Sequence, residues 1–150
     1  MSQATVKYLT FFIGEEEYGI DIFQVREIIG VQPITRVPRT AASIRGVINL
    51  RGKVLPVLDL RTVLELPEGC GETCIVVVEF RESLVGVVID RVGEVATIAT
   101  EEIELPALGA SVNTQCLRGI ARRGTRVRLL LDLERAIPVD VLPGKEPVAA

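Results

Sequence analysis

The stretch SIRGVINLRGKVLPVLDLR, residues 43–61, contains two apolar runs on either side of a short turn. The two runs, residues 46–50 and 53–58, are typical of β-strands. Asn49 suits the first position of a type I turn, where its side chain can bond the backbone, and Gly52 suits a position with positive φ. We therefore expect a hairpin with Leu50 and Arg51 at its tip. Such a tip either folds back against a barrel end with a solvated arginine or forms a contact for a partner.

Short strands separated by turn signals continue along most of the chain. The other strand candidates are residues 6–13, 18–20, 73–80, 84–89, 117–122 and 125–131. Pro56 indicates that the strand 53–58 lies at a sheet edge or at a bulge, because proline cannot donate to the strand ladder. Together these signals predict an all-β fold with short helices.

Three short helices are expected between the strands. Asp21 is the predicted N-cap of a helix over residues 22–29, with Gln24 at the capping-box position and Gly30 at its end. Ile22, Val25, Ile28 and Ile29 would form the apolar stripe of that helix, and Phe23, Arg26 and Glu27 would face away from it. Residues 60–64 and 132–137 are predicted as further helical turns.

The second half of the chain repeats the first. One block aligns at an offset of 67 residues, with Gly19, Ile22, Val25 and Glu27 matching Gly86, Ile89, Val92 and Glu94. Another aligns at an offset of 73, with Arg45, Gly46, Val54, Leu58, Asp59 and Leu60 matching Arg118, Gly119, Val127, Leu131, Asp132 and Leu133. We expect one domain over residues 1–150, built from two small β-barrel lobes with repeat halves near 6–64 and 73–137. An exchange of strands between the lobes is left open.

Composition disfavours several functional classes. The 150 residues contain no histidine, which removes the usual general base and the commonest metal ligand. The net charge of −3 is unsuited to a general attraction for nucleic acid. No apolar run approaches the roughly 20 residues of a membrane helix, and the N-terminus lacks a signal-peptide pattern. We expect a cytoplasmic protein without membrane insertion.

The candidate ligands and acids have plain interpretations. Three cysteines, an odd number, indicate free thiols, and Cys70 and Cys74 have no second pair that would complete a zinc site. Asp59 and Asp132 each precede a predicted helix, where an N-cap is commoner than a catalytic carboxylate. No cofactor, metal or catalytic residue is predicted.

Three motifs resemble the CheW family of chemotaxis coupling proteins. They are EEEYGIDIFQVREIIG at residues 15–30, IRGVINLRGKVLPVLDLR at 44–61 and LVGVVIDRVGEV at 84–95. The resemblance covers nearly the whole chain and implies two five-stranded, SH3-like barrels without catalytic activity. It also implies an adaptor that couples the cytoplasmic tip of methyl-accepting chemoreceptors to the histidine kinase CheA, with other CheW-like domains as further partners in rings.

The resemblance implies that receptor helices bind in the groove between the lobes, and it gives the positions of the contacts. They are Val25, Glu27 and Arg51, with Asn49 and Leu50 nearby. Arg51 would make a charge-assisted contact to the receptor, and Glu27 would accept from a receptor cation or amide. Val25 is at odds with the predicted helix, because the apolar stripe would bury it.

The kinase contacts carried over from the family are less sharply defined. Gly52, Gly86 and Gly119 match family glycines, although backbone conformation at turns or close strand approach is the favoured explanation for each. The candidates for an apolar edge that docks on the regulatory domain of CheA are Leu55, Val57, Leu117 and Ile120.

One arginine cluster is not explained by the resemblance. Arg118, Arg122, Arg123, Arg126 and Arg128 lie close together on the last predicted hairpin. The cluster is either a solvated face or a patch for acidic ligands. A nucleic-acid-binding barrel using this hairpin, disfavoured by the acidic net charge, and an unrecognised enzyme remain the alternative functions.

Overall fold

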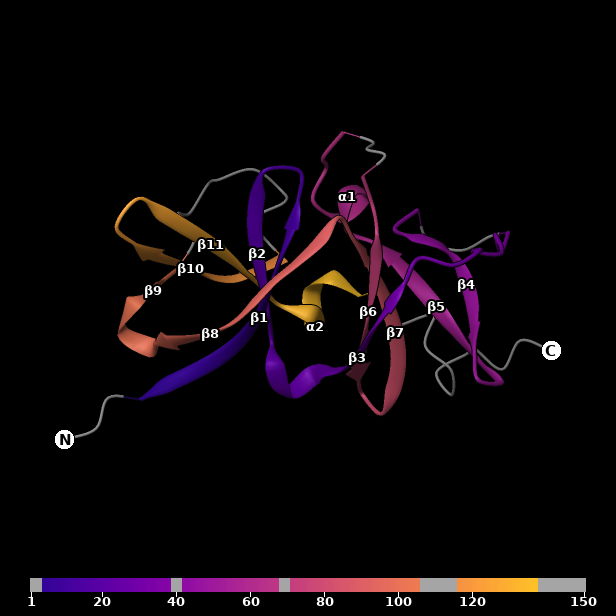
Figure 1. Ribbon diagram of the computed structural model, residues 1–150, viewed down its shortest axis with the longest axis horizontal. Helices are drawn as coiled ribbons and strands as arrows, with labels where there is room; N and C mark the ends of the chain where they lie inside the picture. Colours follow the sequence, from indigo (N-terminus) through magenta and orange to yellow (C-terminus); the bar gives the residue numbers. More distant parts are fainter. Residues whose placement is uncertain (1–3, 39–41, 68–70, 106–115, 138–150) are drawn as a thin grey trace.

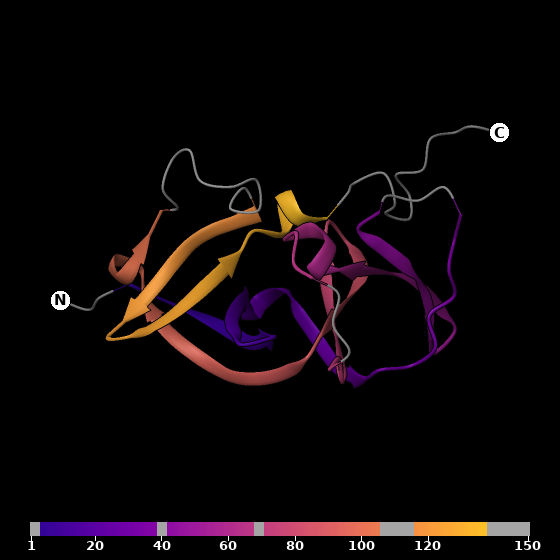
Figure 2. The same cartoon turned by 90° about the horizontal axis from the view of Figure 1, so that it is seen from above.

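The computed structural model describes residues 4–38, 42–67, 71–105 and 116–137. Within these residues the chain folds into two curved sheets that lie side by side (Figures 1 and 2). The strands are β1 (Thr5–Ile13), β2 (Glu16–Asp21), β3 (Val25–Gly30), β4 (Ile44–Leu50), β5 (Lys53–Asp59), β6 (Cys74–Phe80), β7 (Ser83–Ile89), β8 (Arg91–Ala99), β9 (Ile103–Glu104), β10 (Leu117–Arg123) and β11 (Arg126–Leu131). The helical turns are η1 (Ile22–Gln24), α1 (Leu60–Val63), η2 (Thr100–Glu102) and α2 (Leu133–Ala136). The predicted all-β, two-lobed fold is confirmed, with six strands in one sheet where five were expected.

Each sheet curves into a barrel because one segment of chain reaches both of its edges. The five-stranded sheet has the order β3-β6-β7-β5-β4, and we call it barrel B. The chain beyond β3 returns to the opposite edge, where Thr35 and Val47 exchange two backbone hydrogen bonds of 2.9 and 2.8 Å. The six-stranded sheet, barrel A, has the order β8-β1-β2-β11-β10-β9, and its edge strands β8 and β9 follow one another through η2. Closure of this kind leaves few free strand edges.

The two sequence halves share both barrels. Barrel A combines the N-terminal hairpin β1–β2 with strands β8–β11, and barrel B combines β3–β5 with the hairpin β6–β7. In each barrel one parallel pair of strands joins the two sequence halves: Val57 of β5 lies opposite Gly86 of β7, and Gly19 of β2 lies opposite Leu130 of β11. The repeat relates these two pairs, because Val57 aligns with Leu130 and Gly19 aligns with Gly86.

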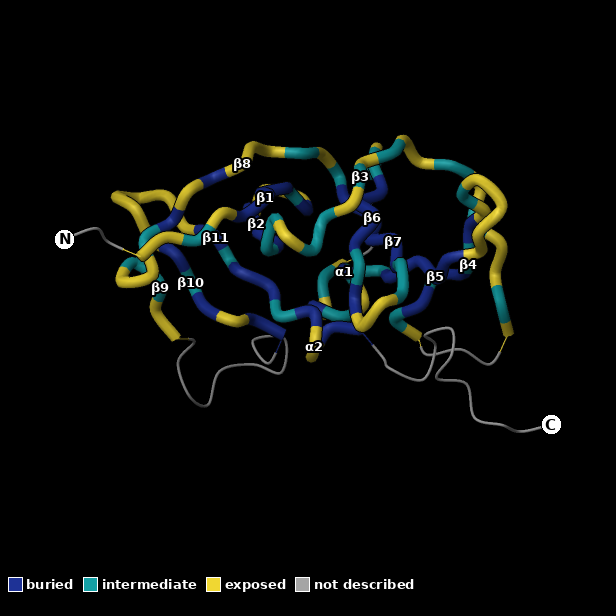
Figure 3. Tube along the Cα trace, turned by 90° about the horizontal axis from the view of Figure 1, so that it is seen from below, coloured by how far each residue is buried: buried dark blue, intermediate teal, exposed yellow. Residues whose placement is uncertain are grey.

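The largest apolar cluster lies at the junction of the barrels. Its buried side chains come from β1, β2 and β6, among others, and from α1 and α2, which supply Leu60, Leu64, Leu133 and Ala136. Both helical turns lie at the centre of the molecule (Figures 1 and 2). Smaller clusters fill barrel B, around Val57, and barrel A, around Leu130. Exposed residues are frequent in the turns at the barrel ends (Figure 3).

Three short-range predictions of helix caps are confirmed. Asp21 accepts from the Phe23 amide, Asp59 from the Arg61 amide and Asp132 from the Glu134 amide, at 2.9 to 3.0 Å. The predicted helical turns after Asp59 and Asp132 are present as α1 and α2. A side-chain oxygen that bonds an amide two residues away is a local interaction, so it can be recognised within a few letters of sequence.

The predicted helix over residues 22–29 is wrong. Only the single turn η1 forms there, and residues 25–30 are the strand β3, paired with β6. Ile28, expected on the buried stripe, is exposed, whereas Glu27 and Ile29 are half-buried in the alternating pattern of a strand. The spacing of four residues between Val25 and Ile29 fits a strand as well as a helix, and the pairing with β6 decides for the strand.

Of the two alternatives predicted from Pro56, an edge strand is wrong, whereas a bulge is supported, because the register of β4 and β5 shifts between the pairs Ile44–Leu58 and Gly46–Val57, next to Pro56. Strand β5 lies inside the sheet between β7 and β4. Proline is tolerated because the parallel pairing of β5 with β7 begins only at Val57, and Val47, opposite Pro56, directs its own backbone hydrogen bonds to Thr35. The missing amide proton of Pro56 therefore removes no ladder hydrogen bond.

Candidate functional site

The tip of the β4–β5 hairpin is a two-residue loop made of Arg51 and Gly52. Both residues have positive φ, 49° and 88°, and Leu50 pairs with Lys53 across the strands. This is the pattern of a type I′ turn, not the type I turn predicted, and Leu50 belongs to the strand. The Asn49 side chain does bond the backbone, since Oδ1 accepts from the Gly52 amide at 2.9 Å. Arginine in the left-handed region is strained relative to asparagine or glycine.

Arg51 forms an ion pair with Glu27 across the mouth of barrel B. Glu27 lies on β3 and Arg51 follows β4, and these two strands are the opposite edges of the five-stranded sheet. Nη1 donates to Glu27 Oε2 at 3.2 Å, and Nη2 donates to Oε1. Hydrogen bonding from Arg51 and its charge hold the pKa of Glu27 below its usual value. The Arg51 side chain remains 69% exposed, so the pair presents its charges to solvent.

The other predicted receptor residues surround this pair to different extents. Asn49 is exposed beside the tip, and Leu50 is half-buried against the apolar cluster inside barrel B. Val25 lies two residues before Glu27, half-buried against the junction of the barrels. Strand geometry thus frees Val25 from the buried stripe that a helix would have imposed. The structure brings Glu27, Asn49, Leu50 and Arg51 to one end of barrel B.

The predicted kinase contacts are less accessible. Leu55 and Val57 are 3% and 0% exposed inside barrel B, so their side chains do not form an apolar edge on the surface. This correction follows from the alternation of β5, which turns both residues to the interior. Ile120 is half-buried against the junction, and Gly52 is exposed at the tip.

Gly119 has a packing role in barrel A. A Cβ atom at this position would lie 3.1 Å from the Glu104 carbonyl oxygen and closer still to the Ile103 side chain. Strand β9, which closes the barrel, therefore approaches β10 too closely for any side chain here. Its repeat partner Gly46 faces the Thr35 carbonyl in the same way.

The arginine cluster of the last hairpin is largely paired with acids from other elements. Arg118 lies 3.8 Å from Asp21, and Arg122 lies 3.3 Å from Glu104. Arg126 and Arg128 both bond Glu17, at 2.9 and 3.2 Å. Because these charges are compensated within the protein, the hairpin is a poorer candidate for binding nucleic acid than its sequence indicates.

Sequence reasoning missed the ion pair between Glu17 and Arg128, which are 6% and 8% exposed. Arg128 also donates to Glu94 Oε2 at 2.6 Å. Burial acts to raise the pKa of Glu17, but hydrogen bonds from Arg126 and the charge of Arg128 outweigh it and lower that pKa. The repeat could have indicated that both residues are buried, because Glu17 and Arg128 align with Leu84 and Leu55, two apolar residues of barrel B.

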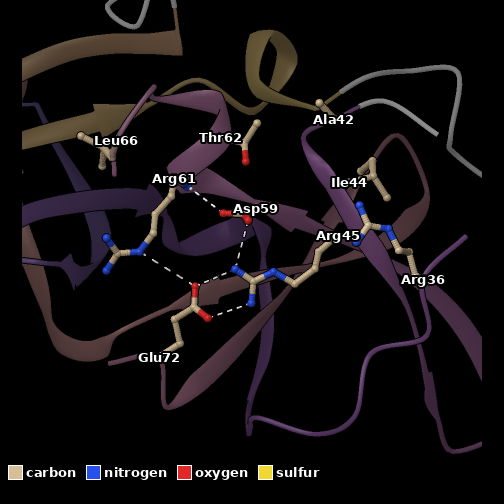
Figure 4. A pocket seen from close by; sticks show the side chains of 9 residues that line it. All are labelled: Arg36, Ala42, Ile44, Arg45, Asp59, Arg61, Thr62, Leu66 and Glu72. Carbon is tan, nitrogen blue, oxygen red and sulfur yellow. Dashed lines mark hydrogen bonds and ion pairs between the residues drawn. The ribbon is translucent and has the colours of Figure 1, made fainter. Parts of the chain in front are cut away.

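A second group of charges lines a hollow of about 440 Å³ near α1 (Figure 4). Arg45 bonds Glu72 at 2.7 Å and Asp59 at 3.0 Å, and Arg61 bonds Asp90 at 2.8 Å. Glu72 lies between the guanidinium groups of Arg45 and Arg61 in this view. Since these acids and bases are bonded to one another, the arrangement links β4, α1 and the residue before β8.

The described residues offer neither a metal site nor a membrane-spanning helix. In the described ranges, no group of three or more cysteine, aspartate or glutamate side chains is placed to hold a metal ion. None of the helices in the part of the chain that the structure describes is long and apolar enough to cross a membrane.

Comparison with known proteins agrees with this architecture. The model of the CheW-like domain matches residues 7–140. The chemotaxis protein CheW of Klebsiella aerogenes is 37% identical over 135 residues, which cover 87% of this chain and 81% of that protein. The CheW of Bacillus subtilis is 37% identical over 129 residues, covering 84% and 83%. The crystal structure of the scaffolding protein TtCheW from Thermoanaerobacter tengcongensis superposes with a TM-score of 0.78 at 33% identity, covering 87% of this chain and 90% of that one. The chain therefore belongs to the CheW-like domain family.

Proposed function

We propose that this protein is a non-catalytic adaptor of chemotaxis signalling that couples methyl-accepting chemoreceptors to the histidine kinase CheA. Membership of a family whose relatives are named chemotaxis proteins, one of them a scaffolding protein, supports this function. Two barrels of similar design that share one apolar cluster suit an adaptor, because each can present a separate surface. Other CheW-like domains are further partners in the same proposal, and the adaptor works in the cytoplasm.

The receptor surface of the proposal is the mouth of barrel B. Its main support is the exposed Glu27–Arg51 pair, which presents an acid and a base side by side on a closed barrel. A receptor segment with a cation facing Glu27 and an acid or carbonyl facing Arg51 would match it. Asn49 holds the turn, and Leu50 and Val25 supply apolar contact area at either side.

The kinase surface of the proposal includes residues of both barrels. A regulatory domain that docks barrel against barrel would meet strand ends and turns. Ile120, half-buried on β10, remains a candidate there. Gly52 and Gly119 contribute through backbone shape, since one forms the hairpin tip and the other allows close strand approach.

A charge swap tests the receptor surface. In Glu27→Arg with Arg51→Glu, the ion pair across the barrel mouth can re-form with reversed polarity, so the fold should stay intact. Binding to the cytoplasmic fragment of a chemoreceptor should weaken at least about tenfold, because like charges then face each other. Binding to the regulatory domain of CheA should be unchanged. The measurement is titration calorimetry of both partners with the wild-type and swapped proteins.

Two results would count against the proposal. Unchanged receptor affinity in the swapped protein would remove the Glu27–Arg51 pair from the interface. No binding of the wild-type protein to either partner at tens of micromolar protein would reject the adaptor function itself.

A further inference from the structure

The hollow near α1 is lined by more arginine than acid (Figure 4). Its charged lining residues are Arg36, Arg45, Arg61, Asp59 and Glu72, three bases against two acids. Both acids are bonded to Arg45, at 2.7 Å for Glu72 and 3.0 Å for Asp59. Arg36 is exposed and forms no ion pair with any residue that the structure describes. The hollow therefore presents a positive charge that the described lining does not compensate.

Arg61 keeps one buried donor without an acceptor. Its Nη2 donates to both carboxylate oxygens of Asp90 at 2.9 and 2.8 Å, and its Nη1 donates to the Pro67 carbonyl at 3.1 Å. Its Nε is the only buried side-chain nitrogen or oxygen of the described residues that has no hydrogen-bond partner. Glu72 Oε2 lies 4.0 Å from this Nε, beyond hydrogen-bond distance. An unbonded buried donor costs free energy, so an acceptor that reached this atom would be stabilised.

The carboxylate of Glu72 cannot serve both arginines at once. Oε1 accepts from Arg45 Nη1 at 2.7 Å, and Oε2 accepts from Arg45 Nη2 at 2.8 Å. This two-fold pairing fixes the plane of the carboxylate and leaves no oxygen for Arg61 Nε. A tetrahedral oxyanion has oxygens that point out of such a plane, so it can bond the guanidinium groups of Arg45 and Arg61 together.

We propose that this hollow binds a small tetrahedral oxyanion of the phosphate class, in the place that the Glu72 carboxylate now occupies. Arg45 and the Nε of Arg61 hold the oxygens of the anion. Arg36 attracts it from the side of the hollow, and the Thr62 hydroxyl, which also lines the hollow, is a further donor. The volume of about 440 Å³ has room for an ion of this size.

Glu72 acts as an internal competitor for the anion. Its side chain is 15% exposed, and it must leave Arg45 before an oxyanion can enter. Asp59 stays in place, because it also accepts from the Arg61 amide as the N-cap of α1. Affinity for the anion is accordingly lower than two guanidinium groups alone would give, and it should rise when the charge of Glu72 is removed.

The test is a titration of the full chain with sodium phosphate at pH 7, followed by nuclear magnetic resonance of the Arg61 Nε–H group. A buried Nε–H exchanges slowly with water, so its signal can be observed. Phosphate should shift this signal in a saturable way, because the unbonded donor gains an acceptor. Sodium chloride at the same ionic strength should leave the signal in place.

Three variants assign the site to these residues. Glu72→Gln should bind phosphate at least about tenfold more tightly, because glutamine keeps the shape of the side chain without the negative charge. Arg36→Gln should bind about threefold more weakly, since it removes a charge at the side of the hollow. Arg123→Gln is the matched control. Arg123 is exposed on barrel A and, like Arg36, forms no ion pair within the described ranges, so its loss should leave the affinity unchanged.

Several results would overturn the proposal. The site is rejected if phosphate causes no saturable shift of the Arg61 Nε–H signal, or if chloride causes the same shift. Equal losses in Arg36→Gln and Arg123→Gln would show that net charge, not the hollow, attracts the anion. Unchanged affinity in a folded Glu72→Gln would reject the competition. If Glu72→Gln does not fold, the two exposed arginine variants still decide, because equal affinities in both and in the wild-type protein would exclude the hollow.

Discussion

At the scale of the residue, Arg51 combines a strained backbone with an exposed charge. Its φ of 49° lies in the left-handed region, where asparagine and glycine are at ease and most other residues are not. The turn would therefore be better served by asparagine before Gly52. A residue that sits in a turn against its own backbone preference is a sign of a role outside the turn, and the receptor contact that we propose would be such a role.

We expect Arg51→Asn to stabilise the protein and weaken receptor binding together. Asn-Gly is the favoured pair of a type I′ turn, so the Tm should rise by about 2–4 °C in a thermal unfolding experiment. Arg51→Ala is the control, because it removes the guanidinium without relieving the backbone and should not raise the Tm. Equal Tm values for Arg51→Asn and the wild-type protein would show that the turn stores no strain.

At the scale of the element, equivalent strands of the two barrels have different interiors. Leu84 and Leu55 meet the apolar cluster inside barrel B, whereas their repeat partners in barrel A are Glu17 and Arg128. Buried ion pairs often give no more stability than apolar residues of similar size, because desolvation offsets the attraction. Leucine, the residue at both equivalent positions of barrel B, is therefore the substitution to test for the charged pair of barrel A.

We expect the double variant Glu17→Leu with Arg128→Leu to be within about 1 kcal/mol of the wild-type free energy of unfolding at neutral pH. Glu17→Leu alone should cost about 3 kcal/mol, because Arg128 is left buried with only Glu94 as partner. Urea denaturation of the three proteins measures both values. A double variant as unstable as Glu17→Leu alone would mean that barrel A needs the Glu17–Arg128 ion pair for its stability and does not accept apolar side chains in its place.

The same pair predicts a dependence on pH. The pKa of Glu17 in the folded protein lies below its ordinary value of 4.5, so its contribution to stability is complete above that value. The contribution is lost as the pH falls from 4.5 through the lowered pKa, because the unfolded chain takes up the proton first. The free energy of unfolding of the wild-type protein should therefore fall more steeply below pH 4.5 than that of the double variant. Parallel curves would exclude Glu17 as the group responsible.

At the scale of the whole molecule, neither sequence half can complete a barrel alone. Barrel B needs β6 and β7 from the second half, and barrel A needs β1 and β2 from the first. The main apolar cluster also draws on both halves, with Phe11 and Leu58 from one and Val76 and Leu131 from the other. Unfolding should accordingly be one cooperative transition for the entire chain.

We expect fragments 1–67 and 71–150 each to be unfolded in isolation and to regain strand structure when mixed. Alone, each fragment exposes the apolar faces that its partner strands would cover, so burial cannot offset the loss of chain entropy. Far-UV circular dichroism of the separate and mixed fragments measures the result. Native-like strand signal in either fragment by itself would contradict the shared-core account.

The structure agrees with most of the sequence predictions that depend on local interactions, although the β4–β5 turn is of type I′ and not of the predicted type I. The hairpins, the caps at Asp59 and Asp132 and the positive φ of Gly52 were all readable from neighbouring letters. The helix over residues 22–29 failed because its apolar spacing fits two periods, and the outcome depended on whether β6 was available as a partner. At the candidate site, Arg51 could be singled out as a tip residue, but its pairing with Glu27 could not, because the two residues lie on opposite sheet edges.

The sequence by itself determined the alternation of strands, the turn chemistry, the repeat and the family, since hydrogen bonding and side-chain alternation act over a few residues. Only the tertiary structure decided which hairpin joins which barrel, through the parallel pairs of β5 with β7 and of β11 with β2. It also decided that Leu55 is hidden, that Arg128 is buried and that Phe23 is exposed. Burial of apolar side chains drives these arrangements. Because the hydrophobic effect has no direction, a strand sequence is compatible with several neighbouring strands until the whole core has formed.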